Sequence, residues 1–398
     1  MAEHKSYDVI IVGAGSMGMS AGYNLARRGV KTLLVDTFDP PHTQGSHHGE
    51  SRLIRHAYSG DPAYTDLALR ADTLWKEAEQ LSGTELLVRS GVLNLADSAV
   101  YSFNGRLEEA KKRKVQVHHL DAEEIRRRWP ALNIPESFAA MYEPDAGYLY
   151  SERCISAYRQ LALGHGAELL TNTPVVNVTA REGSVTVHTT NGDYHGAAVI
   201  LSAGAWFGKL APFVHLPIKA IRKVVGWFES SPAFAAGNFP GFTLGAEEGG
   251  YYGFPSIDGA GLKIGRHDTG LEWKPGTQLA PFGSEASDEG DLRKVLESYM
   301  PGAAGRLLKG SACKYEHTPD EDFIIDCHPL HSNVLIAGGF SGHGFKFSSV
   351  VGEILADLAI GGVTTHNIQP FSLSRFAPSD HSQQVLYWRG FNEQSSNQ

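Results

Sequence analysis

The spacing of apolar residues changes twice over the first forty residues, and this pattern predicts a strand, a helix and a second strand. Residues 8–12 (Asp-Val-Ile-Ile-Val) are dominated by β-branched side chains, as in a strand buried on both faces of a parallel sheet. Small and apolar residues then recur at helical spacing over 16–28, and Gly29 stands where a helix end favours the left-handed conformation. Residues 31–35 predict the second strand, with Asp36 at its end.

Further helices and strands follow along the chain. Helical spacing recurs over residues 62–81, for which Asp61 is a natural N-cap and Pro62 a suitable first helical residue. Shorter helices are predicted over residues 103–113, 121–128 and 151–165. Strands are predicted at residues 168–170, 175–179, 184–189 and 197–203.

The pattern changes after Lys219. Apolar and aromatic residues alternate at 224–228, 251–254 and 262–265, with many glycines between them, which is typical of an antiparallel sheet. Near Asp322 the strand–helix pattern returns, with strands at 323–326 and 333–339 and a helix over about 344–360.

These elements predict a mixed α/β and α+β fold, in which an antiparallel-sheet substrate domain is inserted into a Rossmann-like cofactor domain. The cofactor domain is assigned residues 1–90, 148–217 and 320–376. The substrate domain is assigned residues 91–147 and 218–319, and residues 377–398 are interpreted as a flexible tail.

Composition narrows the class of protein. The chain has 398 residues, which favours two domains, and its net charge of -9 argues against a nucleic-acid partner. Three cysteines are too few for a disulfide framework and fit a reducing compartment. No segment approaches the roughly 20 apolar residues of a membrane span, and no signal peptide is seen, so we expect a cytoplasmic protein without a membrane partner.

The first turn carries the pattern Gly-Ala-Gly-Ser-Met-Gly between a strand and a helix. In this motif the first glycine makes the tight turn, the second lets the backbone approach a pyrophosphate, and the third lets the helix pack on the strand. The helix N-terminus offers amides and a partial positive charge to phosphates, and an acid after the second strand can accept hydrogen bonds from a ribose. The residues predicted to bind the dinucleotide are Gly13, Gly15, Ser16, Met17, Gly18 and Asp36.

Two later segments favour FAD over a nicotinamide cofactor. Residues 199–204 end a strand in Ser-Ala-Gly, a second close approach of backbone to cofactor. Residues 338–344 (Gly-Gly-Phe-Ser-Gly-His-Gly) precede the last predicted helix, whose N-terminus is suited to face the flavin C2 carbonyl, where negative charge develops on reduction. A nicotinamide enzyme has no need of this second helix.

Four longer motifs stand outside the first turn: residues 45–52 (GSHHGESR), 251–255 (YYGFP), 263–267 (KIGRH) and 339–346 (GFSGHGFK). They closely resemble the family of covalent flavoprotein amine oxidases that includes monomeric sarcosine oxidase and N-methyltryptophan oxidase, over about residues 7 to 376. The resemblance implies that a secondary N-methyl amino acid is oxidised at its methyl carbon, with sarcosine as the first candidate substrate. Dioxygen becomes hydrogen peroxide, and the imine hydrolyses to formaldehyde and the demethylated amino acid, glycine in the case of sarcosine. It also implies a monomer.

The resemblance also implies roles for single residues. Cys313 matches the cysteine that carries FAD through an 8α thioether, whereas Cys154 and Cys327 match nothing and are interpreted as packing residues. Lys263 matches the lysine over the flavin where oxygen is activated, although by strand alternation alone it would be an outward-facing residue.

The polar lining of the site is implied in the same way. Arg55 and Lys346 match the pair that binds the substrate carboxylate, a task suited to two cations. The other residues placed at the catalytic site are Arg52, His267, Tyr315 and Tyr252. The further residues placed near the flavin are His48, Ser51, Arg52, Gly342, Gly344 and Lys346. No metal site is expected, because His47 and His48 are adjacent and lack further ligands at metal-binding spacing.

Two positions depart from the sarcosine oxidase pattern and leave the substrate side chain open. Thr243 replaces a bulky apolar residue, and Trp227 is similar to the tryptophan-oxidising relative. Two other functions are weighed: a nicotinamide-dependent dehydrogenase, against which Cys313 speaks, and a non-catalytic flavin-binding protein, which has no need of cations such as Lys263 and Arg55.

Overall fold

The strand–helix–strand unit predicted at the start of the chain forms as β1 (Ser6–Val12), α1 (Ser16–Ala26) and β2 (Thr32–Val35). The structure is a computed structural model that describes residues 6–210 and 213–377. β1 pairs in parallel with β2 on one side and with β12 on the other, and its Ile10 and Ile11 are fully buried. A strand enclosed in this way requires the β-branched run that the sequence carries.

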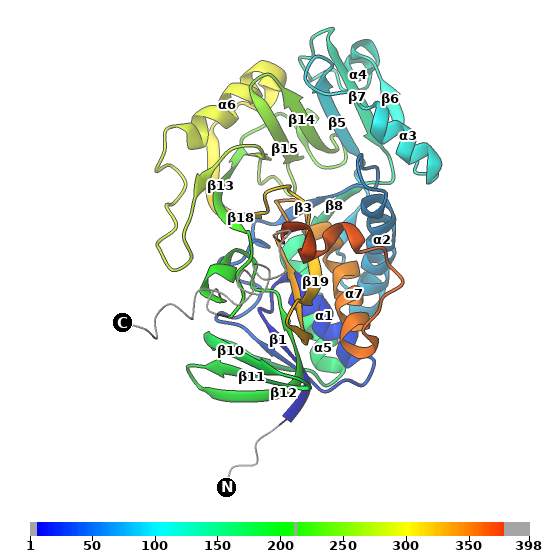
Figure 1. The fold of residues 1–398 in the computed structure, drawn as a ribbon. Helices are drawn as coiled ribbons and strands as arrows, with labels where there is room; N and C mark the ends of the chain where they lie inside the picture. Colours follow the sequence, from blue (N-terminus) through cyan, green and yellow to red (C-terminus); the bar gives the residue numbers. More distant parts are fainter. Residues whose placement is uncertain (1–5, 211–212, 378–398) are drawn as a thin grey trace.

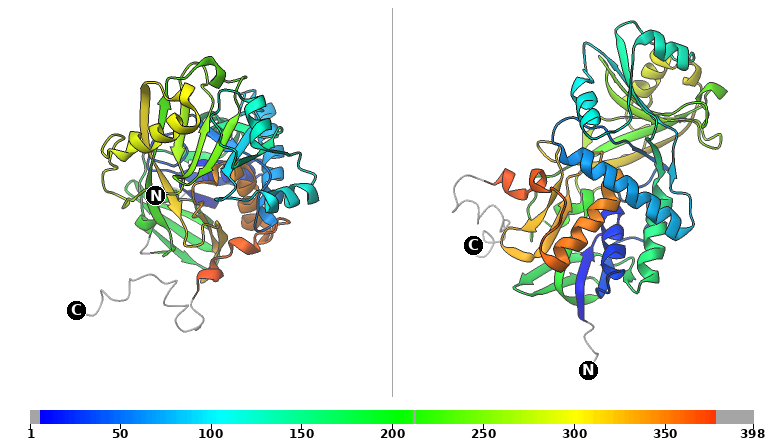
Figure 2. Two further views of the ribbon diagram at one scale, coloured as in Figure 1. Left: turned by 90° about the horizontal axis from the view of Figure 1, so that it is seen from above. Right: turned by 90° about the vertical axis from the view of Figure 1, so that its right-hand side faces the viewer.

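The first sheet has eight strands among the described residues. Its order is β10 (Val175–Arg181), β11 (Ser184–Thr189), β12 (Gly192–Leu201), β1, β2 and β9 (Glu168–Leu170), with β20 (His331–Gly338) beside β12 and β19 (Ile324–His328) beside β20. One side of the sheet is covered by the helices α1, α2 (Ala63–Ser82), α5 (Ser151–Gly164) and α7 (Ser348–Gly361) (Figure 1, Figure 2).

The second sheet forms the other lobe and has nine strands in the described part of the chain. Its order is β17 (Leu271–Glu272), β13 (Lys219–Phe228), β16 (Leu262–Arg266), β15 (Gly249–Phe254), β14 (Gly241–Ala246), β5 (Val92–Asp97), β7 (Phe138–Glu143) and β6 (His118–Leu120), with β18 (Leu307–His317) also beside β13. All pairings are antiparallel except β14 with β5. The helices of this lobe are α3 (Asn104–Lys112), α4 (Ala122–Arg128) and α6 (Ser287–Tyr299).

A third, small sheet of β3 (Ser51–Ile54), β8 (Gly147–Tyr150) and β4 (Leu87–Val88) is formed by residues that flank the lobe boundaries. The predicted mixed fold with an antiparallel second sheet is therefore confirmed. The two large sheets are also the basis on which we propose the domain division given above. Residues 378–398 of the predicted tail lie outside the described residues.

The last helix begins later than predicted. Residues 345–347 form a short 3₁₀ turn, and α7 starts only at Ser348. Ser341 and Gly342 both have left-handed backbone conformations, with φ of 47° and 78°, which interrupts the chain before the helix. The loop over 339–344 therefore separates β20 from α7 and contacts β18, where the Ser341 amide donates to the Glu316 carbonyl at 2.8 Å.

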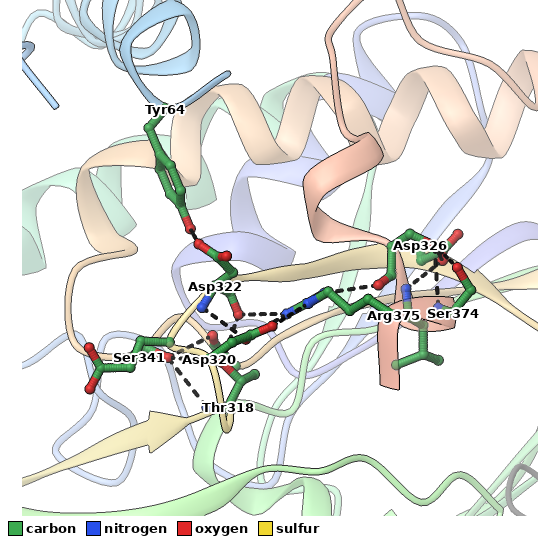
Figure 3. A network of polar contacts seen from close by, with 12 residues as sticks. Tyr64, Thr318, Asp320, Asp322, Asp326, Ser341, Ser374 and Arg375 are labelled. Carbon is green, nitrogen blue, oxygen red and sulfur yellow. Dashed lines mark hydrogen bonds and ion pairs between the residues drawn. The ribbon is translucent and has the colours of Figure 1, made fainter. Parts of the chain in front are cut away.

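A polar network fixes the loop over residues 318–322 (Figure 3). Arg375 forms an ion pair with Asp320, with 2.8 Å between Nε and Oδ2, and donates to the carbonyl of Asp322 at 2.9 Å. The Tyr64 hydroxyl on α2 donates to the Asp322 carboxylate at 2.7 Å, and the Thr318 hydroxyl donates to the Asp322 carbonyl at 2.8 Å. The loop is thus held from two sides, by α2 and by the segment after α7.

No helix among the described residues combines the length and the apolar character needed to cross a lipid bilayer.

Candidate active site

A cavity of about 1210 Å³ extends from the first glycine turn to the second sheet. Segments that are far apart in the sequence contribute to its wall. The predicted site residues that line it are Gly13, Gly15, Ser16, Met17, Asp36, His48, Arg52, Arg55, Tyr252, Lys263, His267, Cys313, Tyr315, Gly342, Gly344 and Lys346. Two predicted cofactor contacts, Gly18 and Ser51, are not part of the lining and lie behind it.

The glycine turn has the geometry that a pyrophosphate requires. Gly13 has φ of +94°, and a Cβ there would lie 2.5 Å from the carbonyl oxygen of Ser202. A Cβ at Gly18 would overlap the carbonyl of Gly13, so this glycine serves helix packing. At Gly15 a Cβ would meet only a ring nitrogen of His47, at 3.7 Å, so the backbone surface there is open to a ligand.

Asp36 is fixed at the end of β2 with both oxygens oriented by the backbone. Its Oδ2 accepts from the amide of Ala14 at 2.8 Å, and its Oδ1 accepts from the amide of Phe38 at 2.9 Å. Each carboxylate oxygen can accept a second hydrogen bond, so the side chain can also take up a ribose diol. The residues of this end of the cavity therefore fit the ADP half of FAD.

Arg52 organises the loop over residues 45–52. Its guanidinium donates to the carbonyls of Ser46 at 2.7 Å, His48 at 2.6 Å and Ser51 at 2.7 Å. On the other side of the loop, Glu152 accepts from the amide of Gly49 at 2.7 Å. The loop is thereby held rigid where it borders the cavity.

Lys263 points inward, so the outward orientation that alternation alone suggests is wrong. The side chain is 2 % exposed, and its ammonium donates to the carbonyl of Gly49 and to the carbonyl and hydroxyl of Ser51. The ring of Phe254 lies 4.7 Å from the ammonium nitrogen. Burial, and then the charge of Arg52, lower the pKa of Lys263 well below its usual value. Its hydrogen-bond acceptors within the described chain are neutral, and the more distant charges of Glu50 and Glu152 offset the effects of burial and Arg52 only in part.

Cys313 lies in β18 among cations. Its thiol is buried, lines the cavity, and stands opposite Lys223 in the register of β13 and β18. Burial raises the pKa of the thiol, whereas the charges of Arg52, Lys263, Lys223 and Lys314 act in the opposite direction and favour the thiolate.

Arg55 and Lys346 converge on one aromatic ring. The Arg55 guanidinium carbon is 5.0 Å and the Lys346 ammonium 5.7 Å from the ring centre of Tyr58. Lys346 donates to the carbonyl of His343 at 2.6 Å, and its own carbonyl accepts from the indole of Trp75 at 2.8 Å. Burial and the neighbouring Arg55 lower the pKa of Lys346 well below its usual value, so a bound anion would be stabilised between the two cations.

Uncharged histidine and tyrosine side chains line the cavity together with these cations. The rings of His267 and Tyr315 are 5.6 Å apart between centres, and Gly342 leaves room for the Tyr315 ring, which a Cβ there would overlap. Burial lowers the pKa of His267 to about 4 and that of His48 to about 4, so both imidazoles are neutral at pH 7. Burial also raises the pKa of Tyr252 to about 12.

Arg106 and Glu316 are among the charged residues of the wall that were not predicted. Arg106 lies on α3 and shares a helix face with Phe103 and Ala110, so a cation on an apolar face was the signal available in the sequence. Glu316 lies in β18, a strand whose mixture of lysine, glycine and glutamate gives no alternating pattern. Its Oε2 is buried without a hydrogen-bond partner in the described structure.

Burial raises the pKa of the Glu316 carboxyl from 4.5 to about 8, which predicts a pH-dependent stability. Below pH 4.5 this carboxyl is protonated in both the folded and the unfolded chain. Between pH 4.5 and 8 the unfolded chain releases the proton while the folded chain retains it, so stability is lost as the pH rises. We therefore expect the Tm of Glu316→Gln minus the Tm of the unmodified protein to increase by several degrees between pH 5 and pH 8.

Circular dichroism melts of the flavin-loaded protein at three pH values measure this difference. Glu297→Gln, at an exposed position of α6, is the matched control. A Tm difference for Glu316→Gln that stays constant with pH contradicts the prediction.

No group of three or more histidine, cysteine, aspartate or glutamate side chains suited to a metal ion lies within residues 6–210 and 213–377.

The sequence matches known proteins along nearly its whole length. The family model described as FAD dependent oxidoreductase matches residues 8–358. Monomeric sarcosine oxidase from Bacillus sp. (strain B-0618) is 49% identical over 384 residues, covering 95% of this chain and 98% of the relative. N-methyl-L-tryptophan oxidase from Salmonella heidelberg (strain SL476) is 43% identical over 375 residues, covering 93% of this chain and 99% of the relative.

Solved structures share the fold at lower identity. NikD, described as an unusual amino acid oxidase essential for nikkomycin biosynthesis, has a TM-score of 0.82 at 21% identity, covering 92% of this chain and 97% of its own. L-proline dehydrogenase from P. horikoshii has a TM-score of 0.79 at 23% identity, covering 94% and 98%. At these identities the likeness concerns the fold alone.

Proposed function

The chain belongs to the FAD-dependent oxidoreductase family, within the group of monomeric sarcosine oxidase and N-methyl-L-tryptophan oxidase, and on that premise we propose that it oxidises secondary N-methyl amino acids with dioxygen as the electron acceptor. Sarcosine is the first candidate substrate. The products are then glycine, formaldehyde and hydrogen peroxide. The observation that carries the proposal is the convergence of Arg55 and Lys346 on one ring, in the cavity that Lys263 and Cys313 also line.

FAD fits the residues of this cavity. When bound, it supplies the acceptor for the two electrons that leave the substrate. The open backbone at Gly15 suits its pyrophosphate and Asp36 its ribose, and the loop that Arg52 holds borders the same space. We propose in addition that Cys313 carries the cofactor through an 8α thioether, because its thiol lines the cavity and the surrounding cations offset part of the rise in pKa that burial causes.

The substrate is bound by its carboxylate in this proposal. Two cations buried side by side are costly, and a carboxylate between Arg55 and Lys346 offsets that cost. His267 is neutral at pH 7 and offers a ring nitrogen to the substrate amine without adding charge. This arrangement holds the amine unprotonated, which is the form that can be oxidised.

N-methyl-L-tryptophan is the second candidate substrate, because Thr243 occupies less space than a bulky apolar residue. The Thr243 side chain lines the cavity and donates to Asn94 at 3.1 Å. A larger substrate side chain would therefore lie against a polar part of the wall, where threonine occupies less space than a bulky apolar residue. We further propose that the protein is a monomer, as the name of its relative monomeric sarcosine oxidase suggests, and that it is cytoplasmic, for which its three unpaired cysteines are the support.

Release of hydrogen peroxide tests the function. The purified, flavin-loaded protein is supplied with sarcosine, N-methyl-L-tryptophan or glycine, and peroxide is measured with a coupled peroxidase. We expect peroxide with the N-methylated amino acids and little with glycine. Reduction of NAD⁺ without peroxide would instead support a nicotinamide-dependent dehydrogenase, and the absence of both reactions would support a non-catalytic flavin-binding protein.

A further inference from the structure

Arg106 is a buried cation in the wall of the same cavity. The residue is 5 % exposed, and its Nε donates to the carbonyl of Ala57 at 2.9 Å. Its Nη2 donates to Asn94 Oδ1 at 3.2 Å and to Glu143 Oε1 at 3.1 Å. No hydrogen bond joins its third nitrogen, Nη1, to any residue that the structure describes. The guanidinium is thus fixed in place with one side uncommitted.

Glu143 does not account for the whole of this charge. Its Oε2 accepts from the backbone amides of His56 at 2.8 Å and Ala57 at 3.1 Å. Its Oε1 accepts from Asn94 at 3.3 Å as well as from Arg106. The carboxylate therefore bonds four donors, and its contact with Arg106 is single rather than the bidentate pairing that two planar groups can form.

Asn94 orients the guanidinium. Its Oδ1 accepts from Arg106 and from the Thr243 hydroxyl, while its Nδ2 donates to Met141 O at 3.0 Å and to Glu143. Both Arg106 and Thr243 line the cavity. Thr243, one of the two positions where the sequence departs from the sarcosine oxidase pattern, is therefore joined to Arg106 through the side-chain amide of Asn94.

The charges at this end of the cavity are unbalanced. The charge of Arg55 lowers the pKa of both Arg106 and Lys346, and the charge of Arg106 also lowers the pKa of Lys346. The charge of Glu143 acts on both groups in the opposite direction. When one substrate carboxylate binds at Arg55 and Lys346, the three cations still outnumber the two carboxylates, that of the substrate and that of Glu143. A second anionic group on the substrate would offset this positive excess and would meet a preoriented donor.

We propose that Arg106 binds an acidic group on the substrate side chain, so that the enzyme prefers N-methyl amino acids with a carboxylate side chain, such as N-methyl-L-aspartate, over neutral ones of equal size. This inference rests on the proposed function. Sarcosine has no side chain and leaves Arg106 unused. The alternative is that Arg106 serves only to satisfy Glu143 within the wall.

The test compares an acid with its amide. In steady-state assays of the flavin-loaded enzyme, kcat/KM for N-methyl-L-aspartate is expected to exceed that for N-methyl-L-asparagine by about tenfold to a hundredfold. Arg106→Gln should reduce this ratio to near one, and Arg106→Lys should retain part of it. Arg113→Gln, at the C-terminal end of the same helix, is the control and should leave the ratio unchanged. Equal kcat/KM for acid and amide in the unmodified enzyme overturns the inference.

A second measurement needs no variant and guards against misfolding of Arg106→Gln. Succinate and its half-amide succinamate are compared as competitive inhibitors of sarcosine oxidation, and succinate is expected to bind at least tenfold more tightly. Equal inhibition constants overturn the inference while leaving the proposed function intact. Failure of the unmodified enzyme to oxidise any N-methyl amino acid contradicts the proposed function itself.

Discussion

The Cys313→Ala protein will release its flavin on acid precipitation, leaving a colourless pellet and a yellow supernatant, whereas the pellet of the unmodified protein will stay yellow. The effect is expected to be complete, because alanine offers no atom that can form a thioether. Denaturing gel electrophoresis followed by flavin fluorescence measures the same property on the separated chain.

The reason lies in the chemistry of the thiolate. The thioether would join Sγ to the 8α carbon, and one proton would leave the thiol and one the methyl group. These two protons and two electrons would go to dioxygen, the oxidant of the proposed reaction, and give hydrogen peroxide. The thiolate is the reactive form of cysteine, and the charges of Arg52 and Lys263 offset part of the rise in pKa that burial causes at Cys313.

The other two cysteines supply matched controls. Cys154 lies in the apolar core on α5, and Cys327 lies half-buried on β19, and neither borders the cavity. Cys327→Ala and Cys154→Ala should therefore keep a yellow pellet. A yellow pellet from Cys313→Ala, or a colourless one from the unmodified protein, contradicts the proposed linkage.

Local sequence was sufficient to predict the strand, the glycine turn and the helix at the start of the chain. The roles proposed for Gly13, Gly15 and Gly18 depend on a turn between adjacent elements, and the period of the flanking apolar residues identifies those elements. Asp36 follows from the same unit. The later start of α7 could not be predicted in this way, because Gly342 packs against the ring of Tyr315 and the amide of Ser341 donates to the carbonyl of Glu316, both of which belong to a distant strand.

The substrate end depends on contacts between distant segments. Cys313 and Lys263 became candidates only through family resemblance, since a lone cysteine and an alternating lysine are ordinary in strands. Arg106 and Glu316 escaped prediction because each is buried by tertiary packing, α3 against β5 and β7 in the first case and β18 against the 339–342 loop in the second. For Arg106, a cation on an apolar helix face was the signal that the sequence carried.

Lys263→Met is expected to slow the reaction of the reduced enzyme with dioxygen by about 10²- to 10³-fold, while reduction by the substrate under anaerobic conditions changes less than about tenfold. Methionine keeps the length of the side chain and removes its charge. The ammonium is surrounded by neutral acceptors and aromatic rings, with Trp227 at 5.3 Å and Phe254 at 4.7 Å, so its field is weakly screened. In the proposed reaction, that field is expected to stabilise the negative charge that dioxygen acquires with its first electron.

Lys309→Met is the matched control for this substitution. Lys309 also contacts the ring of Trp227, at 4.6 Å, but it is exposed and its charge is paired with Glu50 at 2.7 Å. Solvent and the carboxylate screen it, so its removal should change the rate with dioxygen by no more than about threefold. Stopped-flow mixing of the substrate-reduced enzyme with oxygenated buffer, followed by the visible absorbance of the flavin, separates the two variants.

The pH dependence of the same rate distinguishes a charge effect from a change of shape. Burial and Arg52 lower the pKa of Lys263, so the ammonium loses its proton at a lower pH than an ordinary lysine. The rate with dioxygen should therefore fall as the pH rises through that lowered pKa, and the Lys263→Met enzyme should show no such fall because it has no proton to lose. Normal reoxidation in the variant, or the same pH profile in both proteins, would show that dioxygen is activated by another group of the cavity.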